Sequence, residues 1–220
     1  SPARNAPSPM GLFQNSDIHD GGTTTSLTTT TLIQPGGGMA LTGISDEVAW
    51  VNDEFEVAMG ETADAVVRRV WQRLSGVDPY VQASRFEVAA ALPGIEFPRM
   101  VPEKVTHISS QLVFDMETGT LDVATAAAFG LWSAEPYTVP RTEGQLIVLR
   151  VGLRSALPDQ GSEGISTFQA TDGRELAWVE GDYVYQLFCR RGISEESCFA
   201  IADSMTSLEV LAFLTGTTPG

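Results

Sequence analysis

The sequence is short of positive charge. It has 13 Lys and Arg against 28 Asp and Glu, which gives a formal net charge of −15. Binding to nucleic acid depends on clustered Lys and Arg that neutralise phosphates, and attraction to anionic lipid head groups depends on the same residues. The charge balance therefore argues against a nucleic-acid partner and against electrostatic binding to a membrane surface. The acidic surplus itself favours solubility.

Long hydrophobic runs are also missing. The longest candidate, 123–132, is only ten residues long and contains Thr125, whereas a membrane helix needs about 18 or more consecutive apolar residues. We therefore expect no membrane span in this chain. The chain begins with Ser-Pro rather than Met, a start that is compatible with removal of a signal peptide or membrane anchor.

Residues that usually carry catalysis or bind metals are scarce. The two histidines are His19, in an acidic N-terminal loop, and His107, in an expected strand. The chain has no Gly-x-Ser-x-Gly elbow, no His-Glu-x-x-His pair and no phosphate-binding loop. Its densest acidic stretches, 45–56 and 115–122, lack the ligand spacing of a calcium loop. We therefore predict no catalytic residue, no metal site and no cofactor, and a protein that is not an enzyme.

Only two cysteines occur, Cys189 and Cys198. One interpretation is a pair of buried thiols in a reducing compartment. The other is a disulfide, because a strand that reverses into a helix brings two Cα atoms within the roughly 4.4–6.8 Å that a disulfide requires. No histidine or aspartate stands near them at metal-ligand spacing. The Thr-rich N-terminus is typical of exported proteins, so we favour the disulfide and an extracytoplasmic location.

The first 38 residues differ in composition from the rest. Seven of the nine residues from Thr23 to Thr31 are threonine, and glycine runs flank this stretch. Such a segment is typical of a flexible or O-glycosylated linker. Because threonine also favours strands, it is equally compatible with an arm that pairs with a sheet edge. Its apolar anchors, and therefore its candidate binding residues, are Leu27, Leu32 and Ile33.

Residues 39–215 are expected to form one α+β domain. The patterns predict a strand over 47–59, an amphipathic helix over 61–76 with Thr62 as its N-cap, and strands over 105–115 and 144–154. The segments 84–94 and 120–132 are each compatible with a strand or a helix. Together they indicate a curved antiparallel sheet packed against two or more helices, with the N-terminal arm extended from it.

The stretch 177–205 has the most definite pattern in the chain. It reads as a strand, a turn at Glu180-Gly181, a second strand and then a helix that begins after Ser194. We expect Trp178 in the core, and a buried helical stripe formed by Phe199, Ala202, Met205 and Leu208. Tyr183 and Tyr185 share one strand face, where they either pack in the core or line an open apolar groove, and both are candidate binding residues.

Two stretches of the chain resemble each other. Residues 49–59 and 177–187 both begin Ala-Trp-Val and continue with a turn-like pair and an alternating tail. This similarity is either chance or the trace of an internal repeat, in which 39–76 and 166–205 would be equivalent.

The region 94–205 resembles the extracytoplasmic domain found at the C-terminal end of bacterial anti-sigma factors and in related lipoproteins. An apolar strand at 145–153 and an Ile-Ala-x-Ser-Met ending at 201–205 contribute to this resemblance. The other matching residues are Phe97, Pro98, Val101, Pro102, Trp178, Glu180, Gly181, Tyr183 and Tyr185. The resemblance implies an antiparallel sheet packed on helices, and a sensory or binding role without catalysis.

Two functions are therefore expected from the sequence. The first is a non-enzymatic binding or regulatory module of a membrane-associated bacterial protein, located outside the cytoplasm. The alternative is a structural subunit of an extracellular or membrane-attached assembly, held to its neighbours by the N-terminal arm. Either function implies a protein partner or a neighbouring subunit.

Overall fold

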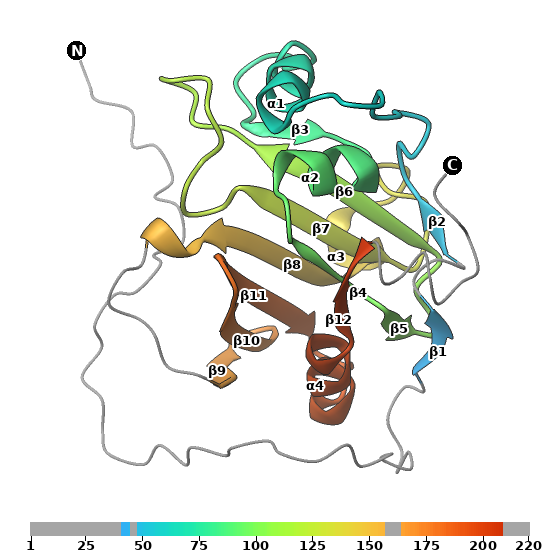
Figure 1. The fold of residues 1–220 in the computed structure, drawn as a ribbon. Coiled ribbons are helices and arrows are strands. Elements are labelled where there is room, and N and C mark those ends of the chain that lie inside the picture. Colours follow the sequence, from blue (N-terminus) through green and yellow to red (C-terminus); the bar gives the residue numbers. More distant parts are fainter. Residues whose placement is uncertain (1–40, 45–47, 157–163, 209–220) are drawn as a thin grey trace, which may run out of the picture.

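The computed structural model describes residues 41–44, 48–156 and 164–208, which form an eight-stranded mixed sheet packed with four helices (Figure 1). The strands lie in the order β2–β6–β7–β8–β11–β10–β9, and β3 also pairs with β6. These strands are β2 (Ala49–Trp50), β3 (Tyr80–Gln82), β6 (His107–Val113), β7 (Ala127–Trp132), β8 (Gln145–Leu153), β9 (Ser166–Ala170), β10 (Gly173–Glu180) and β11 (Tyr183–Arg190). All pairs are antiparallel except β2–β6. The predicted α+β class is confirmed.

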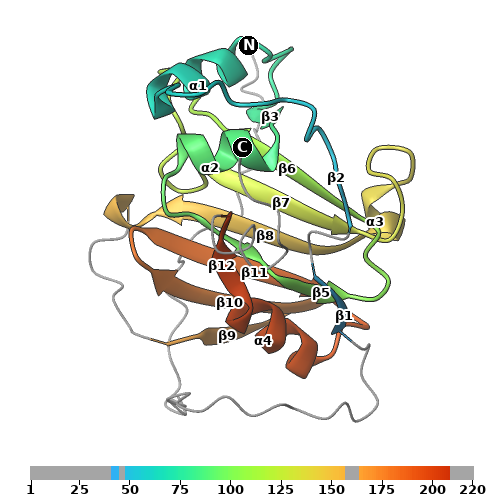
Figure 2. The same cartoon turned by 45° about the vertical axis from the view of Figure 1, so that its right-hand side comes forward.

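Two small sheets and the helices complete the described chain. β1 (Leu41–Ile44) pairs with β5 (Met100–Pro102), and β4 (Glu96–Pro98) pairs with β12 (Met205–Ser207). The helices are α1 (Ala63–Trp71), α2 (Arg85–Ala91), α3 (Arg141–Gly144) and α4 (Glu195–Asp203), and a 3-10 turn follows β8 at Arg154–Ala156. Figure 2 shows α2 and α4 in front of the sheet, with β12 between them.

The helices begin where side chains can satisfy their first amides. The Thr62 hydroxyl accepts from the amide of Ala65 at the start of α1, as predicted. α2 begins with a complete capping box, in which Ser84 and Glu87 each bind the other's backbone amide. The segment 84–94, ambiguous in sequence, is therefore largely helical, while the ambiguous 120–132 contributes β7.

The core lies on the sheet face that α2 and α4 cover. The strand register aligns its side chains in rows, because residues paired across strands point to the same face. One row runs across Leu112, Ala127, Val151, Tyr185 and Trp178, and a second across Ser110, Phe129, Leu149, Leu187 and Leu176. All ten are buried, so the sheet and the helices share one continuous core.

The strand predicted over 47–59 is wrong beyond its first residues. Only Ala49–Trp50 pairs, and the chain then turns, with the amide of Phe55 donating to the carbonyl of Asn52 at 3.1 Å. Asn52 has a φ of +67°, a left-handed conformation that asparagine tolerates better than most residues. After this turn the Asp53 carboxylate accepts from the amide of Arg85 at the start of α2.

The last helix is shorter than predicted, and its buried face is different. α4 ends at Asp203, and Met205 already belongs to β12. Its buried residues are Ser197, Cys198, Ile201 and Ala202. Of the predicted stripe, only Ala202 is thus among them. The helix is turned so that Cys198 faces β11, which places Phe199 at the margin of the core.

The two similar stretches adopt different structures. Ala49–Trp50 is a short strand parallel to β6, whereas 177–187 spans the antiparallel β10–β11 hairpin. The likeness between them is therefore one of sequence pattern, and it does not extend to their strand pairing.

Candidate functional site

Tyr183 and Tyr185, two of the predicted binding residues, belong to the core. They are 6% and 0% exposed. The hydroxyl of Tyr183 donates to the carbonyl of Pro93 at 2.8 Å, and that of Tyr185 accepts from the amide of Glu96 at 2.9 Å. Burial raises the pKa of both phenols above the ordinary value of 10. Of the two roles left open, core packing is the one observed.

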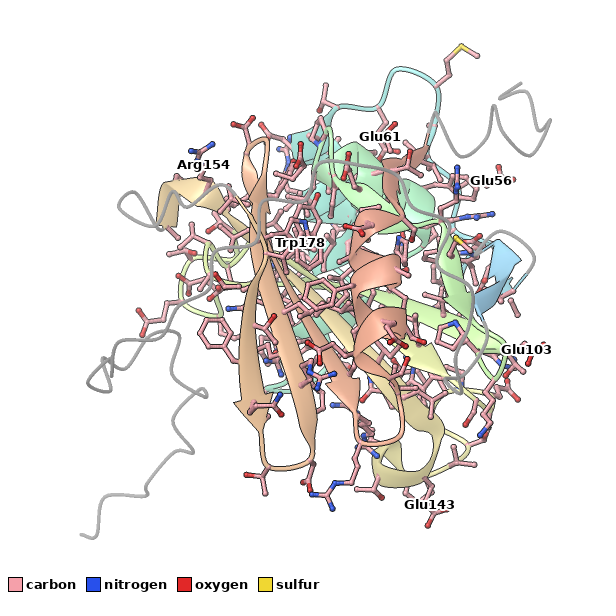
Figure 3. All side chains as sticks on the ribbon, turned by 90° about the horizontal axis from the view of Figure 1, so that it is seen from below. Glu56, Glu61, Glu103, Glu143, Arg154 and Trp178 are labelled. Atoms are coloured by element: carbon pink, nitrogen blue, oxygen red, sulfur yellow. A yellow bond between two sulfur atoms is a disulfide. The ribbon has the colours of Figure 1, made fainter. Side chains whose placement is uncertain are left out.

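Trp178 is part of the same cluster. It is 8% exposed, and its ring stacks on that of Tyr185 with centroids 5.2 Å apart and an angle of 9° between the planes. In Figure 3 it lies on the side of the hairpin that faces α4. The aromatic side chains of 177–187 therefore hold the hairpin to the rest of the domain and leave no open aromatic groove there.

Cys189 and Cys198 form a disulfide that ties β11 to α4. Their Cα atoms are 6.4 Å apart, and both residues are buried. The bond joins the helix covalently to the sheet through Cys198, in the N-terminal half of α4. The remaining predicted binding residues, Leu27, Leu32 and Ile33, lie outside the described residues.

The edge strand β9 is the most exposed strand of the sheet. All five of its residues are exposed, including Phe168 at 50%. Its register with β10 pairs Ser166, Phe168 and Ala170 with Ala177, Glu175 and Gly173. Because hydrogen-bonding direction alternates along a strand, Thr167 and Gln169 point their backbone groups away from β10. No described strand pairs with β9 on that side.

β9 lacks the features that usually protect a sheet edge. It contains no proline and no charged residue. Natural sheet edges use such residues to discourage pairing with another chain. Within the part of the chain that the structure describes, this edge is therefore open to an added strand, which is a common way of binding extended peptides.

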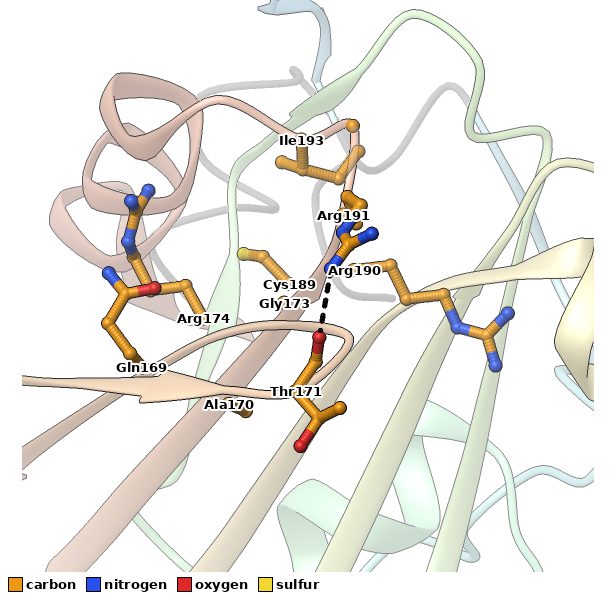
Figure 4. Close-up of a pocket in the computed structure, with 10 residues that line it drawn as sticks. Gln169, Ala170, Thr171, Gly173, Arg174, Cys189, Arg190, Arg191 and Ile193 are labelled. Carbon is orange, nitrogen blue, oxygen red and sulfur yellow. Dashed lines mark hydrogen bonds between the residues drawn. The ribbon is translucent and has the colours of Figure 1, made fainter.

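A cavity of about 240 Å³ adjoins the end of this edge, between the β9–β10 turn and the β11–α4 turn (Figure 4). Its charged lining residues are Arg174, Arg190 and Arg191, and none of its lining residues is acidic. The three arginines point different ways in Figure 4: Arg191 donates to the carbonyl of Thr171, and Arg190 extends away from it. Arg174 pairs with Glu195 at 3.1 Å. Arg190 donates to the carbonyl of Thr142, so the three arginines bind groups of the β9–β10 turn, of α3 and of the start of α4.

A second hollow, the outer groove, lies on the sheet face opposite the core. Its floor is Ala128 and Gly130 on β7, and its volume is about 110 Å³. Longer side chains rise on both sides: Tyr80, Gln111 and Tyr137 on the β6 side, and Gln145, Val148 and Arg150 on β8. Arg141 also lines it. Sequence reasoning missed this groove, because its residues come from five separate segments that only the sheet register brings together.

The alternation of small residues in β7 was the one available signal for the outer groove. Positions 128 and 130 are Ala and Gly, and a Cβ added at Gly130 would lie 2.5 Å from Nε1 of Trp132 and 2.6 Å from Nε2 of Gln145. The indole of Trp132 donates to the Ser109 hydroxyl at 2.9 Å beside this bare position. Glycine is therefore needed here, and it leaves the backbone of β7 uncovered by a side chain of its own.

The described part of the chain contains no cluster of three His, Cys, Asp or Glu residues placed to hold a metal ion. The ring of His107 has the hydroxyl of the adjacent Thr106 2.9 Å from its Nδ1. Within those same residues, no helix is long and apolar enough to cross a membrane.

Comparison with known proteins adds no relative. The chain matches no family model, no curated protein and no solved structure.

Proposed function

We propose that this chain is a non-enzymatic extracytoplasmic binding module, which receives an extended segment of a protein partner at the open edge of β9. The observation that carries the proposal is the pair Thr167 and Gln169, whose backbone groups point outward from a fully exposed edge strand. An added strand would satisfy those groups with main-chain hydrogen bonds.

The buried disulfide supports the location. Disulfides persist in oxidising compartments and are rare in the cytosol, and Cys189–Cys198 joins two elements of the core. Together with the resemblance of 94–205 to domains of anti-sigma factors, this favours a regulatory or sensory module attached to a bacterial membrane.

The same open edge favours a second function, a structural subunit whose N-terminal arm adds a strand to the β9 of a neighbouring subunit. The arm lies outside the described residues, so the edge itself is the argument for this alternative. The two functions differ in what binds at the edge of β9, a segment of a different protein or the N-terminal arm of a neighbouring subunit. One experiment distinguishes them.

The experiment places a photo-crosslinking amino acid at Thr167 in the full chain, expressed in its own cells. The binding module predicts crosslinks to an extended segment of a different protein. Crosslinks to residues 1–38 of a second copy would instead establish the structural subunit. Val77, which is 90% exposed in the turn after α1, serves as the control position.

A pair of substitutions at Gln169 tests the backbone contact. Gln169→Pro removes the outward N–H, which an edge strand tolerates because that group faces solvent, whereas Gln169→Ala removes the side chain and keeps the N–H. We expect the proline variant to lose the crosslink and the alanine variant to keep it. Equal crosslinking at Thr167 and Val77, or no difference between the two variants, would contradict the proposed function.

A further inference from the structure

The outer groove is a second candidate site, independent of the β9 edge and on a different part of the sheet. It is built around one row of the register, in which Gln111, Ala128 and Arg150 are paired across β6, β7 and β8. Adjacent strands lie about 4.8 Å apart, so the two long polar side chains are separated by roughly 10 Å with only a methyl group between them. This spacing leaves room for the hollow of about 110 Å³ above Ala128, which is itself 7% exposed.

The charge of the groove, like that of the arginine-lined cavity beside β9, is opposite in sign to the net charge of the protein. In a chain of net charge −15, its lining contains two arginines and no acidic residue. Arg69, Arg73, Arg85 and Arg174 each pair with a carboxylate, but within the described ranges neither Arg141 nor Arg150 forms an ion pair. Two guanidinium groups that line one hollow and form no ion pair within the described ranges favour an anionic ligand, since their planar donors match carboxylate or phosphate oxygens.

Aromatic side chains form the opposite wall. Tyr80 and Tyr137 are 37% and 49% exposed, so part of each side chain is accessible for contact with a ligand. Tyr137 is held in place although its φ is +68°, a left-handed conformation that costs free energy for a bulky residue. Its hydroxyl accepts from Nε2 of Gln111 at 3.3 Å, and its ring lies 6.0 Å from that of Trp132.

The remaining polar groups can both donate and accept. Gln111 and Gln145 carry amide side chains, and Ser109, 4% exposed, carries a hydroxyl. Groups of this kind match the hydroxyls of a sugar, which also donate and accept. An aromatic wall matches the apolar face of a sugar ring, and the arginines match an acidic substituent.

We propose that the outer groove binds an acidic sugar, with the ring against Tyr80 and Tyr137, the hydroxyls on Gln111 and Gln145, and the anionic group on Arg150 and Arg141. The volume of about 110 Å³ accommodates part of one ring, so the groove binds one unit of a ligand that continues into solvent. A sugar polymer outside the cell fits this description.

The test is an NMR titration of the intact protein, which measures weak affinities and shows which residues respond. The probes are D-glucuronate, D-glucose 6-phosphate, D-glucose and N-acetylglutamate. We expect shifts at groove residues, and at least tenfold tighter binding of one or both acidic sugars than of D-glucose and N-acetylglutamate. The two acidic sugars distinguish a carboxylate from a phosphate ligand.

Three variants locate the contacts. Arg150→Gln should remove the tenfold preference for the acidic sugar, and Arg141→Gln, at an exposed position, should reduce it even if the first variant folds poorly. Tyr80→Ala should weaken acidic and neutral sugars alike by several fold. Arg99→Gln, an exposed arginine outside the groove, should change nothing.

Three results would overturn the proposal. The first is no shift at groove residues with any probe. The second is equal binding of glucuronate and N-acetylglutamate, which would show a carboxylate site without sugar recognition. The third is an effect of Arg99→Gln as large as that of Arg150→Gln, which would show non-specific attraction to positive charge.

Discussion

The helices above the two halves of the sheet pack on one shared core but differ in the interactions that are added to this packing. α1 and α2 are joined by an ionic cluster of Glu61, Arg69, Arg73 and Glu87. In it, Arg69 binds Glu61 through two nitrogens at 3.0 Å and Glu87 at 2.5 Å, and Arg73 binds Glu87 at 2.9 Å. α4 is attached by what we term the α4 cluster: the Cys189–Cys198 disulfide and the stacked rings of Trp178 and Tyr185.

The difference shows what each attachment depends on. Glu87 is fully buried, so its charge is tolerable only while both arginines stay in place. The α4 cluster has no charge to compensate and depends on close packing and on an oxidised bond. The two ends of one domain should therefore respond to different perturbations.

Replacing Trp178 should damage the α4 cluster most. Trp178→Ala removes a buried ring from the stack with Tyr185, and we expect a loss of about 3–5 kcal/mol in the free energy of unfolding. The matched change is Trp71→Ala, which removes a half-buried indole that packs on Phe114 near the ionic cluster and should cost less. Denaturant unfolding measures both. A loss below about 1 kcal/mol for Trp178→Ala would contradict its place in the core.

Neutralising Glu87 should be the largest change available in the ionic cluster. Glu87→Gln keeps an oxygen for the capping box but leaves Arg69 and Arg73 without their shared carboxylate. Breaking a buried ion pair costs about 3–5 kcal/mol, and because the two arginine side chains are 34% and 25% exposed we expect about 3 kcal/mol. Glu195→Gln, which breaks the exposed pair with Arg174, is the control and should change unfolding by less than about 1 kcal/mol.

Removing the disulfide should cost about 2–3 kcal/mol, the chain-entropy value for a short loop. Cys189→Ala combined with Cys198→Ala should show this loss, and reduction of the wild-type protein should reproduce most of it. Reduction and Glu87→Gln should have additive effects on the free energy of unfolding, because the two clusters share no residue. Strong non-additivity in the unfolding free energy would show that the clusters are coupled.

Lowering the pH should change the local stability of the α1–α2 region and of the α4 region in opposite directions. This is the smallest effect we expect. The hydrogen bond from Arg69 lowers the pKa of Glu61 below its ordinary 4.5, so the stability that Glu61 contributes is present above pH 4.5 and is lost as the pH falls through its folded pKa. Burial and then the charge of Glu180 raise the pKa of Glu96, beside Tyr185, and burial raises that of Asp203 on α4. The buried charges of Glu96 and Asp203 destabilise the folded state, and protonation removes this destabilisation as the pH falls through their raised pKa values.

Hydrogen exchange, corrected for intrinsic rates, measures these local stabilities. As the pH is lowered from neutral towards 4.5, the ordinary value for glutamate, protection of α4 and β12 should rise while that of α1 and α2 stays constant. Glu96→Gln should reduce the rise. Parallel behaviour of both regions would contradict the assignment.

Local pattern predicted the elements whose determinants lie close together in sequence. The hairpin 173–190 follows from alternation around Gly181, and the starts of α1 and α4 follow from Thr62 and Ser194, whose side chains accept from amides three residues ahead. The same local pattern placed Cys189 and Cys198 close together, and the Thr-rich N-terminus decided between free thiols and the observed disulfide. Each of these structural features depends on interactions within one stretch of fewer than about twenty residues.

Features fixed by distant contacts were missed. The turn at Asn52 depends on Asp53 reaching α2, and the end of α4 depends on Ser204, whose hydroxyl accepts from the amide of Met100. The outer groove depends on the register of three strands and on a loop that carries Tyr137 back to Gln111. A periodic pattern within one segment cannot predict such contacts, because tertiary packing overrides the local secondary-structure preference of the sequence.

The pairing of β4 with β12 has a consequence for how the chain reaches this structure. β4 carries Phe97, which is fully buried and packs its ring against Trp50 and Phe129, yet its only strand partner among the described residues is β12, at 205–207. Closing such a long loop is slow, because its entropy is lost before the contacts form. β12 must therefore be synthesised before β4 can be paired. A chain interrupted before residue 205 would leave the edge of β4 exposed.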